Sequence, residues 1–180
     1  MIVDSREFHR NGLSYIIRSA VEQDAAELSG LRLQIDGETE NLERRQGEGF
    51  IDAEGFAEII REDTEAGRNL FLVAEVQGRL VGFARCEGSL LTRNLHKVEF
   101  GICILQEFWG YGIGYSLLQL VTAWADNNGI VKISLTVLET NKPAIRLYSK
   151  FGFETEGILK KDKLLADGTY YSTIMMGRFN

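Results

Sequence analysis

The stretch VEFGICILQEFWGYGIG, residues 98–114, joins an apolar run of strand type to three alternating glycines at positions 110, 112 and 114. Glycine lacks a Cβ, so its backbone takes conformations closed to other residues and its amide group can approach a ligand closely. Apolar residues then recur from Leu117 to Ala125 at the spacing of one helix face. The stretch therefore predicts a strand, a glycine turn and the start of a helix.

A glycine-lined helix start is suited to phosphate, because its N–H groups are unpaired and it carries the positive end of the helix dipole. Such turns also occur simply where a chain reverses tightly, and both interpretations stay open on this stretch alone. Neither of two common phosphate loops fits. The P-loop needs Lys and then Ser or Thr after its last glycine, where this chain has Tyr115 and Ser116. The dinucleotide fingerprint needs a third glycine at the position of Tyr115.

Length and composition predict one domain that spans residues 1–180. Hydrophobic residues make up 44% of the 180-residue chain, the proportion expected of an ordinary soluble protein. No run approaches the roughly 18 apolar residues of a membrane span. The N-terminus also lacks the basic-then-apolar order of a signal peptide. We therefore expect a cytoplasmic protein with no membrane partner.

Charge and the scarcity of metal-binding residue types argue against two further classes. The formal net charge of −6 argues against a nucleic-acid partner and slightly favours amine partners. Cys86 and Cys103 lie in apolar, strand-like segments, and His9 and His96 are the two histidines. These four residues make neither a disulfide framework nor a metal site, so we expect no metal.

Hydrophobic periodicity predicts the other elements. They are a strand at 12–18, helices at 22–35 and 52–66, strands at 69–76, 79–86, 97–105 and 131–138, a helix at 141–151, and strands at 153–159 and 169–179. Gln77-Gly78 predicts a hairpin, and Asp52 and Asn141 predict helix N-caps. The polar segment from Asp36 to Phe50 has neither periodicity and predicts a long loop.

Two sequence blocks, taken with this element order, resemble the GNAT superfamily of N-acetyltransferases over nearly the whole chain. The family signature Gln/Arg-x-x-Gly-x-Gly/Ala corresponds to Trp109–Gly114, with Trp109 in place of the usual Gln or Arg. The second block, LTVLETNKPAIRLYSKFGF at 135–153, is similar to L-x-V-x-x-x-N-x-x-A-x-x-L-Y-x-K-x-G-F almost position for position. Each block alone is a weak signal, whereas both in order are specific.

The resemblance implies a fold and an activity. The fold is α/β of mixed α+β type, with a mostly antiparallel sheet of six to seven strands between helices. The sheet would be splayed between the strands at 97–105 and 131–138. The implied activity moves the acetyl group of acetyl-CoA, as co-substrate, directly to a primary amine. A non-catalytic acetyl-CoA-binding sensor or assembly module on the same fold is the alternative.

The resemblance also implies two catalytic residues, Glu99 and Tyr148. An amine must lose a proton to attack a thioester, and the departing sulfur leaves more easily when an acid protonates it. Glu99 is the implied base and Tyr148 the implied acid. The implied cofactor-binding residues are Ile102, Ile104, Trp109, Gly110, Tyr111, Gly112, Ile113, Gly114, Tyr115, Asn141 and Tyr148.

These residues also have plain structural interpretations. Glu99 fits an exposed strand carboxylate, Tyr148 a half-buried aromatic anchor, and Asn141 a helix cap. His96 is a weaker candidate for the base.

The resemblance assigns acceptor recognition to two segments, Asp36–Phe50 and Lys160–Thr169. Glu38, Glu40 and Glu43 in the first segment could attract an ammonium group. The acceptor stays open among an amino acid, a polyamine, an amine antimicrobial and a protein N-terminus. A homodimer is possible, because the last strands of similar proteins often pair between subunits.

Overall fold

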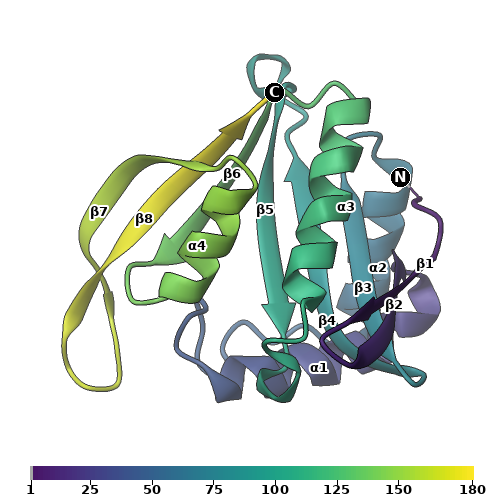
Figure 1. Ribbon diagram of the computed structural model, residues 1–180, viewed down its shortest axis with the longest axis horizontal. Coiled ribbons are helices and arrows are strands. Elements are labelled where there is room, and N and C mark those ends of the chain that lie inside the picture. The colour runs from purple at the N-terminus through teal and green to yellow at the C-terminus, as the bar shows by residue number, and fades with distance from the viewer. Residues whose placement is uncertain (1) are drawn as a thin grey trace.

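Eight strands form the framework of the computed structural model, which describes residues 2–180. They are β1 (Arg6–Arg10), β2 (Leu13–Ser19), β3 (Leu70–Val76), β4 (Arg79–Gly88), β5 (Lys97–Ile104), β6 (Lys132–Leu138), β7 (Glu154–Leu164) and β8 (Tyr170–Phe179). They make one sheet in the order β1-β2-β3-β4-β5-β6-β8-β7 (Figure 1). Every neighbouring pair is antiparallel except β5 and β6. The predicted mixed fold is confirmed, and the strand beyond the predicted seven is β1.

Helices cover both faces of this sheet, which gives the predicted three layers. They are α1 (Ala25–Glu38), α2 (Ala53–Glu65), α3 (Ile113–Asn127) and α4 (Lys142–Lys150). Figure 1 shows α3 and α4 in front of the sheet, with α1 and α2 behind it. Within residues 2–180, no helix is long and apolar enough to cross a bilayer.

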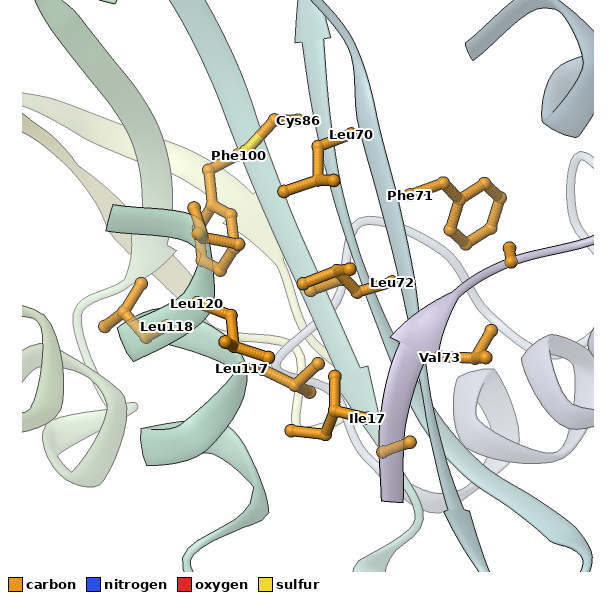
Figure 2. Packing of buried hydrophobic residues seen from close by; sticks show 14 of the residues in the cluster. Ile17, Leu70, Phe71, Leu72, Val73, Cys86, Phe100, Leu117, Leu118 and Leu120 are labelled. Carbon is orange, nitrogen blue, oxygen red and sulfur yellow. The ribbon is translucent and has the colours of Figure 1, made fainter. Parts of the chain in front are cut away.

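The core lies on both sides of β3, where Leu70 to Ala74 are all buried. Figure 2 shows Leu72 on the same side of the strand as Leu117 of α3, while Phe71 points the opposite way. On that opposite side the ring of Phe71 lies 6.5 Å from the ring of Phe56 in α2. Successive strand residues face opposite sides, so a strand between two helical layers must be apolar throughout.

The predicted helix caps and the predicted hairpin turn are confirmed. Asp52 accepts a hydrogen bond from the Gly55 amide at 2.9 Å and caps α2. Asn141 accepts one from the Ala144 amide at 3.3 Å and caps α4. Gln77 and Gly78 have φ values of 51° and 81°, as the two central residues of a type I′ hairpin turn require. The helix predicted to end at Ile35 instead continues to Glu38.

The sheet opens between β5 and β6, as predicted. Their parallel pairing is limited to Lys97–Lys132, Val98–Ile133 and Glu99–Ser134. Beyond Glu99, β5 pairs only with β4, and β6 continues along β8. The second half of β5 therefore has one edge with no strand beside it.

Hydrogen bonds show which residues of β5 point their backbone groups into this opening. The carbonyl of His96 accepts from the Lys132 amide at 3.1 Å, and that of Val98 accepts from Ser134 Oγ at 3.2 Å. On the opposite edge, the Leu105 amide donates to Val81 at 2.9 Å. Because backbone direction alternates along a strand, Ile102 and the other even-numbered residues point their N–H and C=O groups into the opening.

Candidate active site

A cavity of about 450 Å³ lies at this opening. The second half of β5, the glycine turn before α3, the start of α4 and the residues after α1 contribute its walls. Ten of the eleven predicted cofactor-binding residues line it: Ile102, Ile104, Trp109, Gly110, Gly112, Ile113, Gly114, Tyr115, Asn141 and Tyr148. Tyr111, the eleventh, is exposed outside the lining. The fold therefore brings together residues up to 46 positions apart, from 102 to 148.

The glycine turn presents backbone amides at the start of α3. Gly110 and Gly112 have φ values of 84° and 83°, a region that favours glycine. The helical hydrogen bonds begin with the Ser116 amide, which donates to the Gly112 carbonyl at 3.0 Å. No side chain caps this helix start. The N–H groups before Ser116 therefore lack helical acceptors and can bind an anion.

The side chain of Trp109 forms a hydrogen bond within the protein. Its indole Nε1 donates to the carbonyl of Ile104 at 2.8 Å, while 45% of the residue is exposed. This bond satisfies one of the carbonyls that point into the opening and fixes the turn to the end of β5. The N–H and C=O of Ile102 and the N–H of Ile104 remain directed at the cavity.

Tyr148 places a phenol, which can donate a hydrogen bond, in the cavity wall. It is 7% exposed, and its ring lies 6.3 Å from Phe100 and 5.8 Å from Phe153. Within residues 2–180 its hydroxyl has no hydrogen-bond partner. Burial raises the pKa of the Tyr148 phenol well above its ordinary value. The hydroxyl is therefore protonated at neutral pH and can donate a hydrogen bond to a ligand.

Cys103 also lines the cavity, a placement that we did not predict. Burial raises the pKa of its thiol to about 12. A cysteine acts as a nucleophile through its thiolate. Cys103 is thus protonated at neutral pH and is unsuited to carry an acyl group. Its position between Ile102 and Ile104 in sequence was the available signal.

Glu99 lies outside the cavity lining. It is exposed on β5, between Glu87 of β4 and Ser134 of β6. Ile102 lies three positions further along the strand, which is a distance of about 10 Å. A proton would therefore need a water chain to travel from the cavity to this carboxylate. His96, the weaker candidate, is exposed just before β5.

The segment after α1 closes another side of the cavity, where Thr39, Asn41 and Leu42 line it. Glutamates hold this segment in place. Glu38 accepts from the Gln106 amide and Glu40 from the Ala166 amide, both at 2.7 Å. Glu43 pairs with Lys163 of β7. Glu40 and Glu43 thus join the two segments assigned to the acceptor, and Glu38 joins the first of them to Gln106, just after β5, none of which the sequence indicated.

A charged cluster lies beside the same wall. Asp36 accepts two hydrogen bonds from Arg44 at 3.3 Å, and Arg32 lies 3.9 Å away from it. One carboxylate between two guanidinium groups leaves a net charge of +1. The cluster interacts electrostatically with Cys103 in the cavity wall and adjoins Ile35, another lining residue.

Residues 34–153 match the sequence family described as Acetyltransferase (GNAT) family. The chain belongs to this family. Relatives and solved structures agree with the assignment. The chain is 35% identical over 108 residues to the L-amino acid N-acetyltransferase AaaT of Escherichia coli K12. That match covers 59% of this chain and 66% of AaaT, just under two thirds of that relative's length.

Solved GNAT structures share the fold over most of the chain. The acetyltransferase of GNAT family from Streptococcus pneumoniae superimposes with a TM-score of 0.89 at 26% identity, covering 92% of this chain and 99% of that one. YncA, a putative acetyltransferase from Salmonella typhimurium, superimposes with a TM-score of 0.81 at 18% identity, covering 92% and 93%. The YncA structure contains acetyl-CoA as its cofactor.

Proposed function

We propose that this protein transfers the acetyl group of acetyl-CoA directly to a primary amine. One observation carries the proposal: the unpaired edge of β5, the glycine turn and Tyr148 border the same cavity of about 450 Å³. An extended thioester with a diphosphate at its far end would find complementary protein groups along this cavity, from Tyr148 past the edge of β5 to the glycine turn.

The chain's own groups suit the parts of acetyl-CoA. The backbone groups of Ile102 and Ile104 would pair with the amides of the pantetheine arm, as a neighbouring strand would. The amides from Gly110 to Tyr115 would hold the diphosphate at the start of α3. Asn141 and Tyr148 line the cavity between these walls and α4. Bound there, the co-substrate supplies an acetyl thioester whose carbonyl carbon accepts the amine.

The transfer forms a C–N bond and breaks the C–S bond. The amine loses one proton and the departing sulfur gains one. Charge therefore balances when the site removes the first proton and supplies the second. Tyr148 would donate a hydrogen bond, and then the proton, to the departing sulfur, because it lines the cavity and its hydroxyl has no other partner within residues 2–180. Protonated Cys103 supports direct transfer over an acyl-cysteine route.

We assign Glu99 the role of base, acting through water. It is a carboxylate on the strand that borders the cavity, and its exposure allows a water chain to reach it. The neighbouring Glu87 is less suited to the role, because Arg85 binds its carboxylate at 3.0 Å.

For the acceptor we propose an amino acid with an apolar side chain. The Arg32–Asp36–Arg44 cluster carries net positive charge, which favours an acceptor that has a carboxylate and disfavours a polyamine. Leu42 and Phe108 in the cavity lining supply apolar surface. The relative AaaT is an L-amino acid N-acetyltransferase, which agrees with an amino acid as the acceptor.

We also propose that the protein forms a homodimer through exposed apolar side chains of the β7–β8 hairpin. Ile158, Leu159, Leu164 and Tyr170 are between 42% and 59% exposed there. Pairing of β7 edges is disfavoured, because the register shifts twice along β7 and Lys161 has a φ of 53°. The contact would therefore use side chains.

Replacing Tyr148 by phenylalanine is expected to lower kcat about 100-fold, since general acid catalysis contributes at least this much in many enzymes. The dissociation constant of acetyl-CoA should change little, because the ring and its packing remain. Steady-state kinetics and calorimetry measure the two effects. An unchanged kcat would remove Tyr148 from the mechanism, and wild-type binding without turnover of any amine would favour the sensor alternative.

Replacing Glu99 by glutamine is expected to lower the rate about 100-fold near pH 7. The deficit should shrink as pH rises, because the amine then loses its proton without a base. The pH dependence of kcat/KM measures this, with Glu87→Gln as the matched control on the neighbouring strand. Parallel pH profiles for wild type and Glu99→Gln would rule out the assignment.

Leucine and leucinamide share the side chain, and leucinamide lacks the carboxylate. Its amine is also more acidic, so the two acceptors are compared at equal concentrations of free amine. We expect kcat/KM to be about 10-fold higher for leucine, the worth of a charged hydrogen bond. Spermidine should be poorer than either. Release of the CoA thiol reports each rate, and Arg44→Gln should reduce the leucine preference. Spermidine or leucinamide as the best acceptor would contradict the proposal.

Light scattering after size-exclusion chromatography is expected to give twice the 20.3 kDa chain mass. Ile158→Lys should shift the protein toward monomer, since it places a charge on the proposed contact. Leu90→Lys is the control, because Leu90 is 94% exposed outside the hairpin. A wild-type monomer at all concentrations would exclude the dimer.

A further inference from the structure

The N-terminal hairpin of β1 and β2 contacts the glycine turn. Asn11, at the hairpin tip, donates from Nδ2 to the carbonyl of Gly110 at 2.7 Å. Next to it, the guanidinium carbon of Arg10 lies 4.0 Å from the centroid of the Tyr115 ring. Figure 1 shows this hairpin beside the loop that leads into α3. Residues 10 and 11 precede the family match, which begins at residue 34.

Arg10 is a positioned cation without an anionic partner. Within residues 2–180, no carboxylate lies within ion-pair distance of its guanidinium, although the chain has 26 acidic residues. Arg79 makes an instructive contrast. It lies near the same loop, 5.9 Å from the Phe108 ring, and pairs with Glu107 at 3.0 Å.

Gly112 leaves room for Arg10. A Cβ added at position 112 would lie 2.8 Å from Cδ of Arg10 and 3.3 Å from its Cβ. The arginine stem therefore runs directly against the turn that presents the amides. Gly112 and Tyr115, the two residues that hold Arg10, both line the cavity.

The glycine turn and α3 supply no positive side chain of their own. Residues 98–131 contain neither lysine nor arginine. Trp109 uses its single donor on the Ile104 carbonyl. A diphosphate at this turn would thus meet amide dipoles alone, unless another segment contributes a charge. Charged hydrogen bonds are about twice as strong as neutral ones.

We infer that Arg10 binds the diphosphate of acetyl-CoA, so that the N-terminal hairpin forms part of the cofactor site. The inference rests on the proposed function. It selects the diphosphate over the 3′-phosphate, because Arg10 lies against Gly112 and Tyr115 at the helix start that presents the amides.

Three ligands and three variants test this assignment. Calorimetry gives the affinities of CoA and of dephospho-CoA, which lacks the 3′-phosphate. Nuclear magnetic resonance titration with millimolar pantetheine, which lacks all phosphates, gives the affinity of that ligand. Arg10→Gln should bind CoA and dephospho-CoA about 10-fold more weakly than wild type, the range for one charged hydrogen bond. Its affinity for pantetheine should be unchanged.

Two variants serve as controls. Arg10→Lys keeps the charge and should bind CoA more tightly than Arg10→Gln. Arg6→Gln removes an equal charge from an exposed position on the same strand, and its CoA affinity should stay within about twofold of wild type because salt screens distant exposed charges. Thermal unfolding checks that each variant is folded.

Other results would overturn the inference in distinct ways. A loss confined to CoA would assign Arg10 to the 3′-phosphate, and an equal loss for pantetheine would make its role structural. Unchanged affinities in Arg10→Gln would remove it from the site. If wild type bound neither CoA nor dephospho-CoA, the proposed function itself would fail.

Discussion

The structure depends on the parting of β5 and β6 after three paired residues. Backbone N–H and C=O groups in a protein interior need partners, and a strand that loses its neighbour must find them elsewhere. At Ile104 the protein supplies one from the Trp109 indole. At Ile102 the groups face the cavity. The opening therefore creates both the space for a ligand and the hydrogen-bonding groups to hold an extended one.

The start of α3 provides the second half of this site, and its neighbours determine its properties. Gly114 of α3 packs beside β5 and α4, where a Cβ would lie in ordinary van der Waals contact, 3.4 Å from Ile104 and 3.5 Å from Leu147. The turn is held from two sides, by the hydrogen bond of Trp109 to Ile104 of β5 and by that of Asn11 in the N-terminal hairpin to Gly110. Backbone amides held in this way can bind an anion without being reorganised first, which lowers the cost of binding.

The acceptor side is built differently, from two surface segments joined by charged groups. Glu40 and Glu43 connect the segment after α1 to the far end of the β7–β8 hairpin. Behind them, Asp36 holds Arg44 and Arg32 together. Acidic residues that looked available for an amine thus form hydrogen bonds or ion pairs within the protein, and the Arg32–Asp36–Arg44 cluster beside the wall carries a net positive charge. Among the acceptors that the sequence left open, this charge distribution is the reason for proposing an amino acid rather than a polyamine.

The sequence by itself determined the features that depend on neighbours along the chain. The hairpin at Gln77-Gly78, the caps at Asp52 and Asn141, and the glycine turn before α3 each follow from a few adjacent residues. Ten residues of the cavity lining were also named from the sequence, because one strand, one turn and one helix start supply much of that lining. The tertiary structure alone decided the rest. Strand β1 is polar and exists through pairing with β2, and Asn11 meets Gly110 across 99 positions. Such contacts are fixed by packing in three dimensions, which no local pattern records.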